Sequence, residues 1–211
     1  MATTKAYSAQ LIAVYTLALQ FAKERNEIEM SEYEKLIKEL DTLPDKIQEV
    51  IDNQEEIQKF AAKQAAAKDV FFIGRGIDYA VSLEGSLKLK EISYIHSEAY
   101  AAGELKHGTI SLIEDGTLVI GVLTQDELYE KTISNMVECK SRGAYLMGLT
   151  TYGNYTVEDT AEFTVYVPKT DAHFMASLAV VPLQMLGYYV SVAKGLDVDK
   201  PRNLAKSVTV E

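Results

Sequence analysis

The sequence has a single cysteine, Cys139, and only three histidines among its 211 residues. One cysteine excludes an intrachain disulfide, and such scarcity is typical of proteins of the reducing cytosol. Cys139 lies in a helical pattern with no histidine nearby in sequence, so we interpret it as a packing residue. His96 and His173 have no histidine or cysteine partner four residues away, and we expect no metal site.

Positive charge is also scarce, because 21 lysines and arginines stand against 31 aspartates and glutamates, giving a formal charge of −10. A nucleic-acid partner requires a concentrated basic surface, so this balance argues against one. The chain does not open with a basic segment followed by an apolar run, and we expect no signal peptide.

One uncharged stretch, residues 174–193, has the length of a membrane span. Pro182, Gln184 and Gly187 dilute its apolar character, and it follows a strand pattern. A helix buried on most sides in a large core has the same composition. We therefore predict a core helix and no membrane partner.

Residues 3–25 have the pattern of a helix. Thr3 and Thr4 are both suitable N-terminal caps. The chain shows no strand before this helix, and we expect it to be a fragment of a longer protein. One apolar stripe of the helix comprises Leu11, Tyr15, Ala18 and Ala22.

Further helices are expected up to residue 68. Ser31 and Glu34 have the spacing of a capping box, which predicts the start of a second helix. Pro44 suits the first turn of a third helix. The alanine-rich residues 60–68 favour continued helix. None of these helices shows a cluster of ligand residues, and their charges are typical of solvated faces.

From residue 69 onwards, short apolar runs alternate with helical stretches near 77–92, 126–142 and 174–193. Runs with little polar alternation indicate strands buried on both faces, hence a parallel sheet with crossover helices. Ligands of such sheets bind beyond the carboxyl ends of the strands. The strand candidates are Val70–Ile73, Leu118–Leu123, Tyr145–Leu149 and Phe163–Val167. Their carboxyl ends are at Gly74–Gly76, Thr124–Gln125, Thr150–Asn154 and Pro168–Asp171.

Gly74 and Gly76 follow the first strand and precede a helix, an arrangement that also occurs in dinucleotide-binding folds. The third glycine of that fingerprint is absent, because Tyr79 occupies its position. Two glycines allow a tight turn and the close approach of a ligand or a neighbouring segment. We favour a turn that exposes the helix start to a small anion.

Glu84, Lys88 and Glu91 are spaced by four and three residues and share one face of the next helix. An exposed ion pair between the first two would explain the spacing and would contribute only about 0.2–0.5 kcal/mol. Glu91 lies near the helix C-terminus, where the partial negative charge should raise its pKa towards that of a general base. The packed side of the helix is expected to carry Ala80, Leu83 and Leu87.

Two further segments carry candidate residues. His107 lies in a loop-like segment beside Lys106 and before Gly108, where a histidine can titrate near neutrality. The C-terminal segment contains Arg202 and Lys206 among small residues. A lysine in a tail is ordinarily solvated.

Three segments of the sequence are specific enough to be compared with a known family. LEGSLKLKEISYIHSEAYAAGELKHG (83–108) and DVDKPRNLAKSVTVE (197–211) closely resemble the glucosamine-6-phosphate synthase family, the glutamine:fructose-6-phosphate aminotransferases. TTKAYSAQ (3–10) is similar to the end of the first half of that family's isomerase region. The resemblance covers essentially the whole chain, and the GELKHG loop and the tail are its most specific parts.

The resemblance implies a sugar-isomerase (SIS) fold, a three-layer αβα sandwich with a five-stranded parallel sheet. Residues 1–67 would be the end of a first SIS domain and connecting helices, 68–196 a second SIS domain, and 197–211 a catalytic tail. The implied reaction converts fructose-6-phosphate and ammonia derived from glutamine to glucosamine-6-phosphate. It isomerises a ketose imine to an aldose without a metal or an organic cofactor, in the cytoplasm.

The resemblance also assigns roles to residues. Glu91 matches the carboxylate that moves a proton between C1 and C2, and Lys88 a lysine beside it. His107 matches the residue that opens the sugar ring from across a homodimer interface. Lys206 matches the tail lysine that forms a Schiff base, which requires desolvation or a nearby cation such as Arg202. Glu84 and the backbone around Ala205 are expected to contact the substrate.

Two parts of that family have no counterpart here. The family's glutaminase domain begins with a cysteine nucleophile, whereas residue 1 is methionine. The serine- and threonine-rich phosphate loop of the first SIS domain is also missing. We expect a fragment with little turnover alone, whose partners are the glutaminase and first SIS domains. The alternative is a non-catalytic SIS module that binds a sugar phosphate or serves dimerisation.

Overall fold

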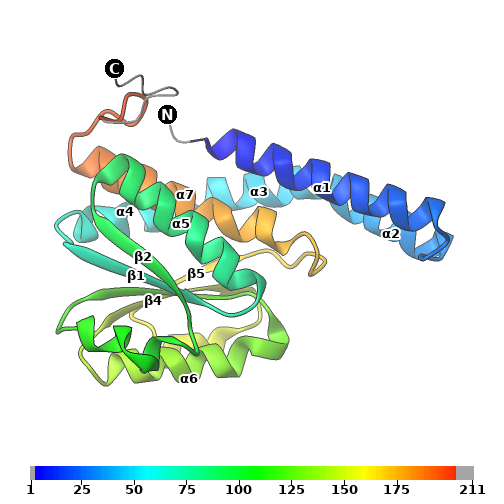
Figure 1. The fold of residues 1–211 in the computed structure, drawn as a ribbon. Coiled ribbons are helices and arrows are strands. Elements are labelled where there is room, and N and C mark those ends of the chain that lie inside the picture. The colour runs from blue at the N-terminus through cyan, green and yellow to red at the C-terminus, as the bar shows by residue number, and fades with distance from the viewer. Residues whose placement is uncertain (1–2, 203–211) are drawn as a thin grey trace, which may run out of the picture.

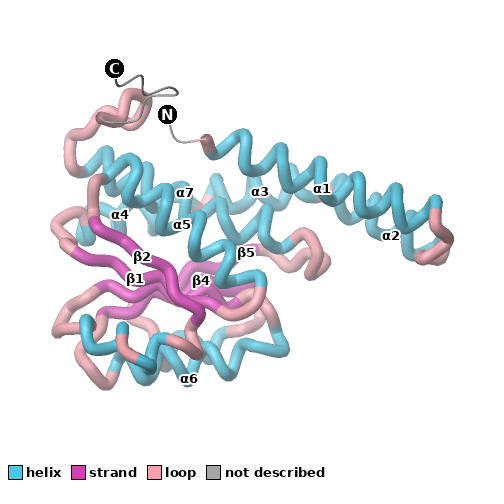
Figure 2. The backbone as a smooth tube through the Cα atoms, in the orientation of Figure 1, coloured by secondary structure: helices cyan, strands magenta, loops and turns pink. Residues whose placement is uncertain are grey.

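A parallel sheet of five strands forms the centre of the molecule (Figures 1 and 2). The computed structural model describes residues 3–202. The strands are ordered β2-β1-β3-β4-β5, and every neighbouring pair is parallel, which confirms the predicted fold class. They comprise β1 (Asp69–Gly74), β2 (His96–Ala101), β3 (Leu118–Leu123), β4 (Tyr145–Thr151) and β5 (Phe163–Val167).

Helices cover both faces of this sheet (Figure 1). One face packs against α4, α5 and α7, and the other against α6 and the 3₁₀ turns η1 and η2. The helices are α1 (Thr4–Glu24), α2 (Met30–Asp41), α3 (Leu43–Asp52), α4 (Gln54–Gln64), α5 (Ile77–Ser93), α6 (Tyr129–Lys140) and α7 (Met175–Ala193). The 3₁₀ turns are η1 (Leu105–His107), η2 (Thr109–Leu112), η3 (Asp126–Leu128) and η4 (Tyr155–Asp159).

Successive side chains of each strand point alternately into two apolar cores, one on each face of the sheet. Phe72 of β1 faces α4, α5 and α7, whereas its neighbour Phe71 faces α6. Cys139 of α6 is fully buried in the second core, and burial raises the pKa of its thiol to about 12. The thiol is therefore a packing group, as the sequence predicts.

The stretch predicted as a core helix, α7, is buried along most of its length, and this prediction is confirmed. By length and composition α7 alone among the described helices would be able to cross a membrane, but it packs against α3, α4 and α5. Its contact with α5 is close, because a Cβ atom at Gly85 would lie 2.6 Å from the Leu183 side chain.

This close contact overturns one expectation. Leu83 and Leu87 do not mark the packed side of α5, since 47% and 40% of their surfaces are exposed. Ala80 is exposed as well. The helix instead turns small residues towards α7, because Gly85 lets the two backbones approach.

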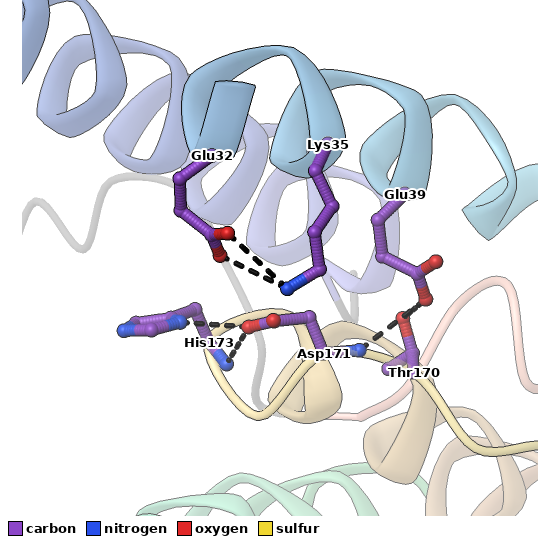
Figure 3. A network of polar contacts seen from close by, with 6 residues as sticks. All are labelled: Glu32, Lys35, Glu39, Thr170, Asp171 and His173. Atoms are coloured by element: carbon purple, nitrogen blue, oxygen red, sulfur yellow. Dashed lines mark hydrogen bonds and ion pairs between the residues drawn. The ribbon is translucent and has the colours of Figure 1, made fainter. Parts of the chain in front are cut away.

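Helices α1 and α2 project from the sheet as a hairpin (Figure 1). Leu19, Leu36 and Phe174 belong to the apolar cluster that joins the hairpin to the start of α7. A polar network reinforces this junction, because Glu39 of α2 accepts hydrogen bonds from the Thr170 hydroxyl at 2.6 Å and the Asp171 backbone at 3.3 Å (Figure 3).

Several local predictions were wrong. Strand β2 was not predicted, because its sequence is polar and it lies at the sheet edge with most side chains partly exposed. No side-chain cap forms at Thr3, and α2 begins after Glu29 rather than at a Ser31–Glu34 box. His107 lies in a 3₁₀ turn rather than a loop.

Candidate active site

The turn between β1 and α5 is tight for a steric reason. A Cβ atom at Gly74 would lie 2.5 Å from the backbone of Asp78. Gly76 has φ +54°, and a Cβ atom there would lie 2.9 Å from the Gln125 side chain. The glycines therefore bring the start of α5 against the end of β3, which is the close approach of a neighbouring segment considered from the sequence.

Asp78 fills this junction with a carboxylate of the chain itself. It is 2% exposed and accepts hydrogen bonds from the Thr124 backbone N–H at 2.8 Å, from the Thr124 hydroxyl, and from the Gln125 backbone N–H at 3.3 Å. Burial raises the pKa of Asp78, and these donors oppose the rise. The donors at the end of β3 thus bind a carboxylate from the first turn of α5, and the small anion expected at the start of this helix stays a prediction.

A hollow of about 460 Å³ remains beside this junction, over the carboxyl ends of β3, β4 and β5. Thr124, Thr151 and Lys169 line it, together with the carboxylates of Asp126 and Glu127. The sequence predicts a crevice at this edge, but the two acids give it mixed charge.

The charged face of α5 lies nearer the opposite, amino edge of the sheet, because α5 runs back from the carboxyl end of β1 to the start of β2. Lys88 is 2% exposed, and its Nζ atom lies 2.6 Å from Oε2 of Glu91 and 3.6 Å from Oε1 of Glu84. The side chains of Glu84 and Glu91 are 13% and 21% exposed. The structure therefore brings together three of the predicted site residues.

The interpretation of an exposed Glu84–Lys88 pair is wrong on two counts: the lysine is buried, and its closer partner is Glu91. Burying an ammonium group costs several kcal/mol unless carboxylates and hydrogen bonds compensate. Two acids surround one base, so the cluster keeps a net negative charge. Among the described residues, no hydrogen bond is made to Oε1 of Glu91.

A tyrosine of α1 belongs to the same neighbourhood, and sequence reasoning did not identify it. Burial raises the pKa of Tyr7 to about 12, and the charge of Glu84 adds to the rise. Burial also raises the pKa of Glu84 itself, against the effect of Lys88. Tyr7 lies four residues before Leu11, so the predicted apolar stripe of α1 was the available signal.

His107 lies far from this cluster within one chain. It is exposed in η1, beyond the carboxyl end of β2, whereas Glu91 precedes the start of that strand. Six strand residues span about 20 Å. The structure therefore does not bring His107 together with Glu91 in a single copy.

The tail residues Lys206 and Ala205 lie outside the described residues. Arg202 is the last residue described, and its guanidinium group lies over the ring of Tyr94 at 4.2 Å from the centroid. Tyr94 follows the last residue of α5, so the described part of the tail meets the end of the helix that carries Glu91. The described residues contain no group of three histidine, cysteine or acidic side chains able to hold a metal.

In chemical terms, a carboxylate held from one side by a buried ammonium group is suited to moving a proton. The ammonium fixes the orientation of Glu91 and offsets the negative helix end, while one carboxylate oxygen is left for a substrate. The five-stranded parallel sheet with helices on both faces, and this cluster on α5, define an α/β domain with a candidate site for proton transfer.

Comparison with known protein families identifies this domain. The SIS domain family matches residues 65–194, more than half of the chain, and the chain belongs to this family.

The chain is also similar to particular proteins. It is 56% identical over its whole length to the isomerizing glutamine–fructose-6-phosphate aminotransferases of Caldanaerobacter subterraneus subsp. tengcongensis and of Clostridium tetani. Its structure resembles the C-terminal domain of glucosamine-fructose-6-phosphate aminotransferase from Francisella tularensis, with a TM-score of 0.87 and 34% identity. That similarity covers 95% of this chain and 57% of the other. The chain spans about a third (35%) of the length of the two curated relatives, matching their C-terminal part.

Proposed function

We propose that this chain is the isomerase portion of a glutamine–fructose-6-phosphate aminotransferase, which isomerises the imine of fructose-6-phosphate to glucosamine-6-phosphate. The observation that carries the proposal is the buried Lys88 held at 2.6 Å from Glu91. An aldose–ketose proton shift needs one group that accepts a proton at one carbon and returns it at the next. A carboxylate oriented by a fixed ammonium group meets that requirement.

Each residue of the cluster has a proposed role. Glu91 moves the proton between C1 and C2, and Lys88 orients it and stabilises negative charge on the enediol-like intermediate. Glu84 completes the charge balance of Lys88 and faces the substrate. Lys206 forms the Schiff base with the open-chain ketose, and the backbone around Ala205 contacts the sugar.

His107 is proposed to serve the site of a second copy. Its position beyond the opposite end of β2, about 20 Å along the strand from the Glu91 end, supports a role across a homodimer interface. There it would protonate the ring oxygen and open the sugar ring, a step suited to a histidine near neutral pH.

The proposed function also implies a domain organisation for the chain. Residues 1–67 would complete a first SIS domain and its connection, 68–196 the second SIS domain, and 197–211 the catalytic tail. In support, α1 exposes an apolar stripe of Val14, Leu17 and Phe21, which a preceding domain would cover. That domain would supply the phosphate anchor, a further domain would release ammonia from glutamine, and the enzyme would work in the cytoplasm without an added cofactor.

The test uses a polypeptide of the relatives' length that ends in this chain. Formation of glucosamine-6-phosphate from fructose-6-phosphate and ammonium is measured for the wild type and for Glu91→Gln. We expect the substitution to lower kcat by 100-fold or more, about the contribution of a general acid–base. Glu130→Gln is the matched control, because Glu130 is an exposed glutamate on α6, on the other face of the sheet.

The outcomes separate the proposal from its alternative. If the wild type binds fructose-6-phosphate but forms no product, the chain belongs to a non-catalytic sugar-phosphate-binding or dimerisation module. If Glu91→Gln retains the activity of Glu130→Gln, the base has been assigned to the wrong residue. The chain by itself, without the phosphate anchor, is expected to show little or no turnover.

A further inference from the structure

Helix α5 ends in an unusual backbone conformation. Its C-terminal cap is Tyr94, with φ 61° and ψ 16°, in the left-handed region. Glycine is the usual residue at this position, because a Cβ atom is strained there. Besides Tyr94, Asn26 is the only non-glycine residue between residues 3 and 202 with positive φ, and asparagine tolerates that conformation well. A tyrosine at such a strained site suggests that its side chain has a task.

The side chain of Tyr94 holds the start of the C-terminal segment. Its hydroxyl oxygen accepts a hydrogen bond from the backbone N–H of Arg202 at 2.7 Å. The Arg202 guanidinium lies over the Tyr94 ring, 4.2 Å from its centroid, in cation–π geometry. One side chain thus binds the backbone and the side chain of a residue that lies 108 positions further along the sequence.

Residues 197–201 bring the chain to this contact in an ordered manner. The carboxylate of Asp197 accepts hydrogen bonds from the backbone N–H groups of Asp199 at 3.0 Å and Lys200 at 3.1 Å, which forms a turn after α7. Pro201 is buried immediately before Arg202. The segment therefore has a turn, a buried proline and the contact with Tyr94 as successive points of attachment.

We infer that Tyr94 is a positioning residue that fixes the origin of the C-terminal tail beside the proton-transfer cluster. This inference rests on the proposed function, in which Lys206 acts on the substrate near Glu91. Tyr94 follows Glu91 by three residues, about 4.5 Å along the helix axis. Lys206 follows Arg202 by four residues, so its Cα atom lies at most about 14 Å from that of Arg202.

The contact should raise the effective concentration of the Lys206 side chain near Glu91. With the contact formed, four residues separate Lys206 from its anchor at Arg202. If loss of the contact also releases the buried Pro201 and the Asp197 turn, the nearest anchor is Ala193, the last residue of α7, thirteen residues before Lys206. The effective concentration at the end of a freely sampling chain falls with about the −3/2 power of its length, so loss of the contact should lower it by up to about sixfold.

The first experiment tests the contact itself in this chain. Trypsin cleaves after Arg202 but not at the Lys200–Pro201 bond, and release of residues 203–211 is followed by intact mass. We expect Tyr94→Asn, which tolerates the left-handed conformation but lacks the ring, to accelerate this cleavage. Tyr94→Phe, which keeps the ring and loses only the hydroxyl, should be intermediate. Tyr155→Asn, at an exposed tyrosine of η4, is the matched control.

The second experiment tests positioning in the longer polypeptide. Borohydride trapping of fructose-6-phosphate on Lys206 is timed by mass spectrometry, and kcat and KM are measured in parallel. We expect Tyr94→Asn to slow trapping and lower kcat by up to about sixfold, with Tyr94→Phe in between. KM should change little, because the phosphate group is bound by another domain.

The possible results are distinguishable. Cleavage of Tyr94→Asn at the wild-type rate would show that the contact does not restrain the tail. Faster cleavage with unchanged trapping would show that the contact is structural only. If the wild-type polypeptide neither traps the sugar nor turns over, the proposed function fails and the positioning role fails with it, while the cleavage result still decides the contact.

Discussion

The two ends of the sheet hold buried charge in opposite ways. At the carboxyl edge, Asp78 accepts three hydrogen bonds from Thr124 and Gln125, all supplied by the chain itself. Towards the amino edge, Lys88 is buried between Glu84 and Glu91, two acids for one base, and both acids keep some exposure. The first arrangement is complete without a ligand, whereas the second retains a negative charge and, within residues 3–202, a Glu91 oxygen without a hydrogen bond.

This difference separates structural from functional buried charge. Both groups are about equally inaccessible, so burial alone does not distinguish them. What distinguishes them is whether every carboxylate oxygen has an internal donor: both oxygens of Asp78 do, whereas Oε1 of Glu91 has none among residues 3–202. On that criterion Asp78 is a structural carboxylate at the edge where open α/β sheets usually bind ligands, and the proposed site of proton transfer lies on the face of α5.

Lys88→Met should have the largest effect on stability and would break the cluster at the amino edge. It leaves two partly buried carboxylates without their cation, and removal of one partner of a buried ion pair costs about 3 kcal/mol or more. The free energy of unfolding is measured by urea titration at pH 7. Lys90→Met removes an exposed lysine from the same helix and should cost less than about 0.5 kcal/mol. Equal costs for the two variants would contradict the importance of the buried ammonium.

Asp78→Asn tests whether the internal carboxylate at the carboxyl edge stabilises the fold. An amide group cannot accept from all the donors of Thr124 and Gln125, and leaving a buried donor unpaired costs about 2 kcal/mol. The same urea titration measures this cost. Asp126→Asn, an exposed neighbour on η3, is the control and should be nearly neutral. A neutral result for Asp78→Asn would show that the internal carboxylate does not hold the turn.

Glu39→Gln should have a smaller effect at the same edge, where α2 is attached to the loop after β5 (Figure 3). Lys46, followed by Thr170, lowers the pKa of Glu39 by hydrogen bonding to it. A lowered folded-state pKa stabilises the fold above the ordinary glutamate pKa of about 4.3, and this contribution is lost as the pH falls through the folded-state value. We expect a cost of about 1 kcal/mol at pH 7 that declines as the pH falls below the ordinary glutamate pKa and through the lowered folded-state pKa.

Thermal unfolding at several pH values measures this dependence. Glu32→Gln is the matched control, because Glu32 forms an exposed pair with Lys35 on the same helix and should contribute less than about 0.5 kcal/mol. A cost for Glu39→Gln that does not decline as the pH is lowered from 7 towards acid unfolding would contradict the assignment of the stabilisation to the ionised carboxylate.

Much of the sheet could be predicted from the sequence, because β1, β3 and β4 are apolar runs buried on both faces and β5, although an edge strand, is rich in Phe, Val and Tyr. Strand β2 could not, since a polar edge strand has no such run. The same holds for the orientation of α5: Leu83 and Leu87 suggested a packed side, but the approach of α7 at Gly85 decides the rotation.

The candidate site was predictable as a set of residues but not as an arrangement. The spacing of Glu84, Lys88 and Glu91 placed them on one face, yet whether that face is buried depends on elements distant in sequence. The contact between Tyr94 and Arg202 joins segments 108 residues apart, and no local pattern indicates it. The separation of His107 from Glu91 likewise followed only from the course of β2.

The most direct test of the account compares one substitution from each end of the sheet in the longer polypeptide. Exchange of the C1 and C2 protons of the sugar phosphate with deuterated solvent is followed by NMR, at a temperature where both variants are folded. The account predicts that folded Glu91→Gln, although it loses stability with the charge of Lys88's closest partner, lowers the exchange rate by about 100-fold or more. Asp78→Asn, despite its lower stability, should keep most of the wild-type rate. Surviving exchange in Glu91→Gln, or its loss in folded Asp78→Asn, would contradict the assignment of the chemistry to α5.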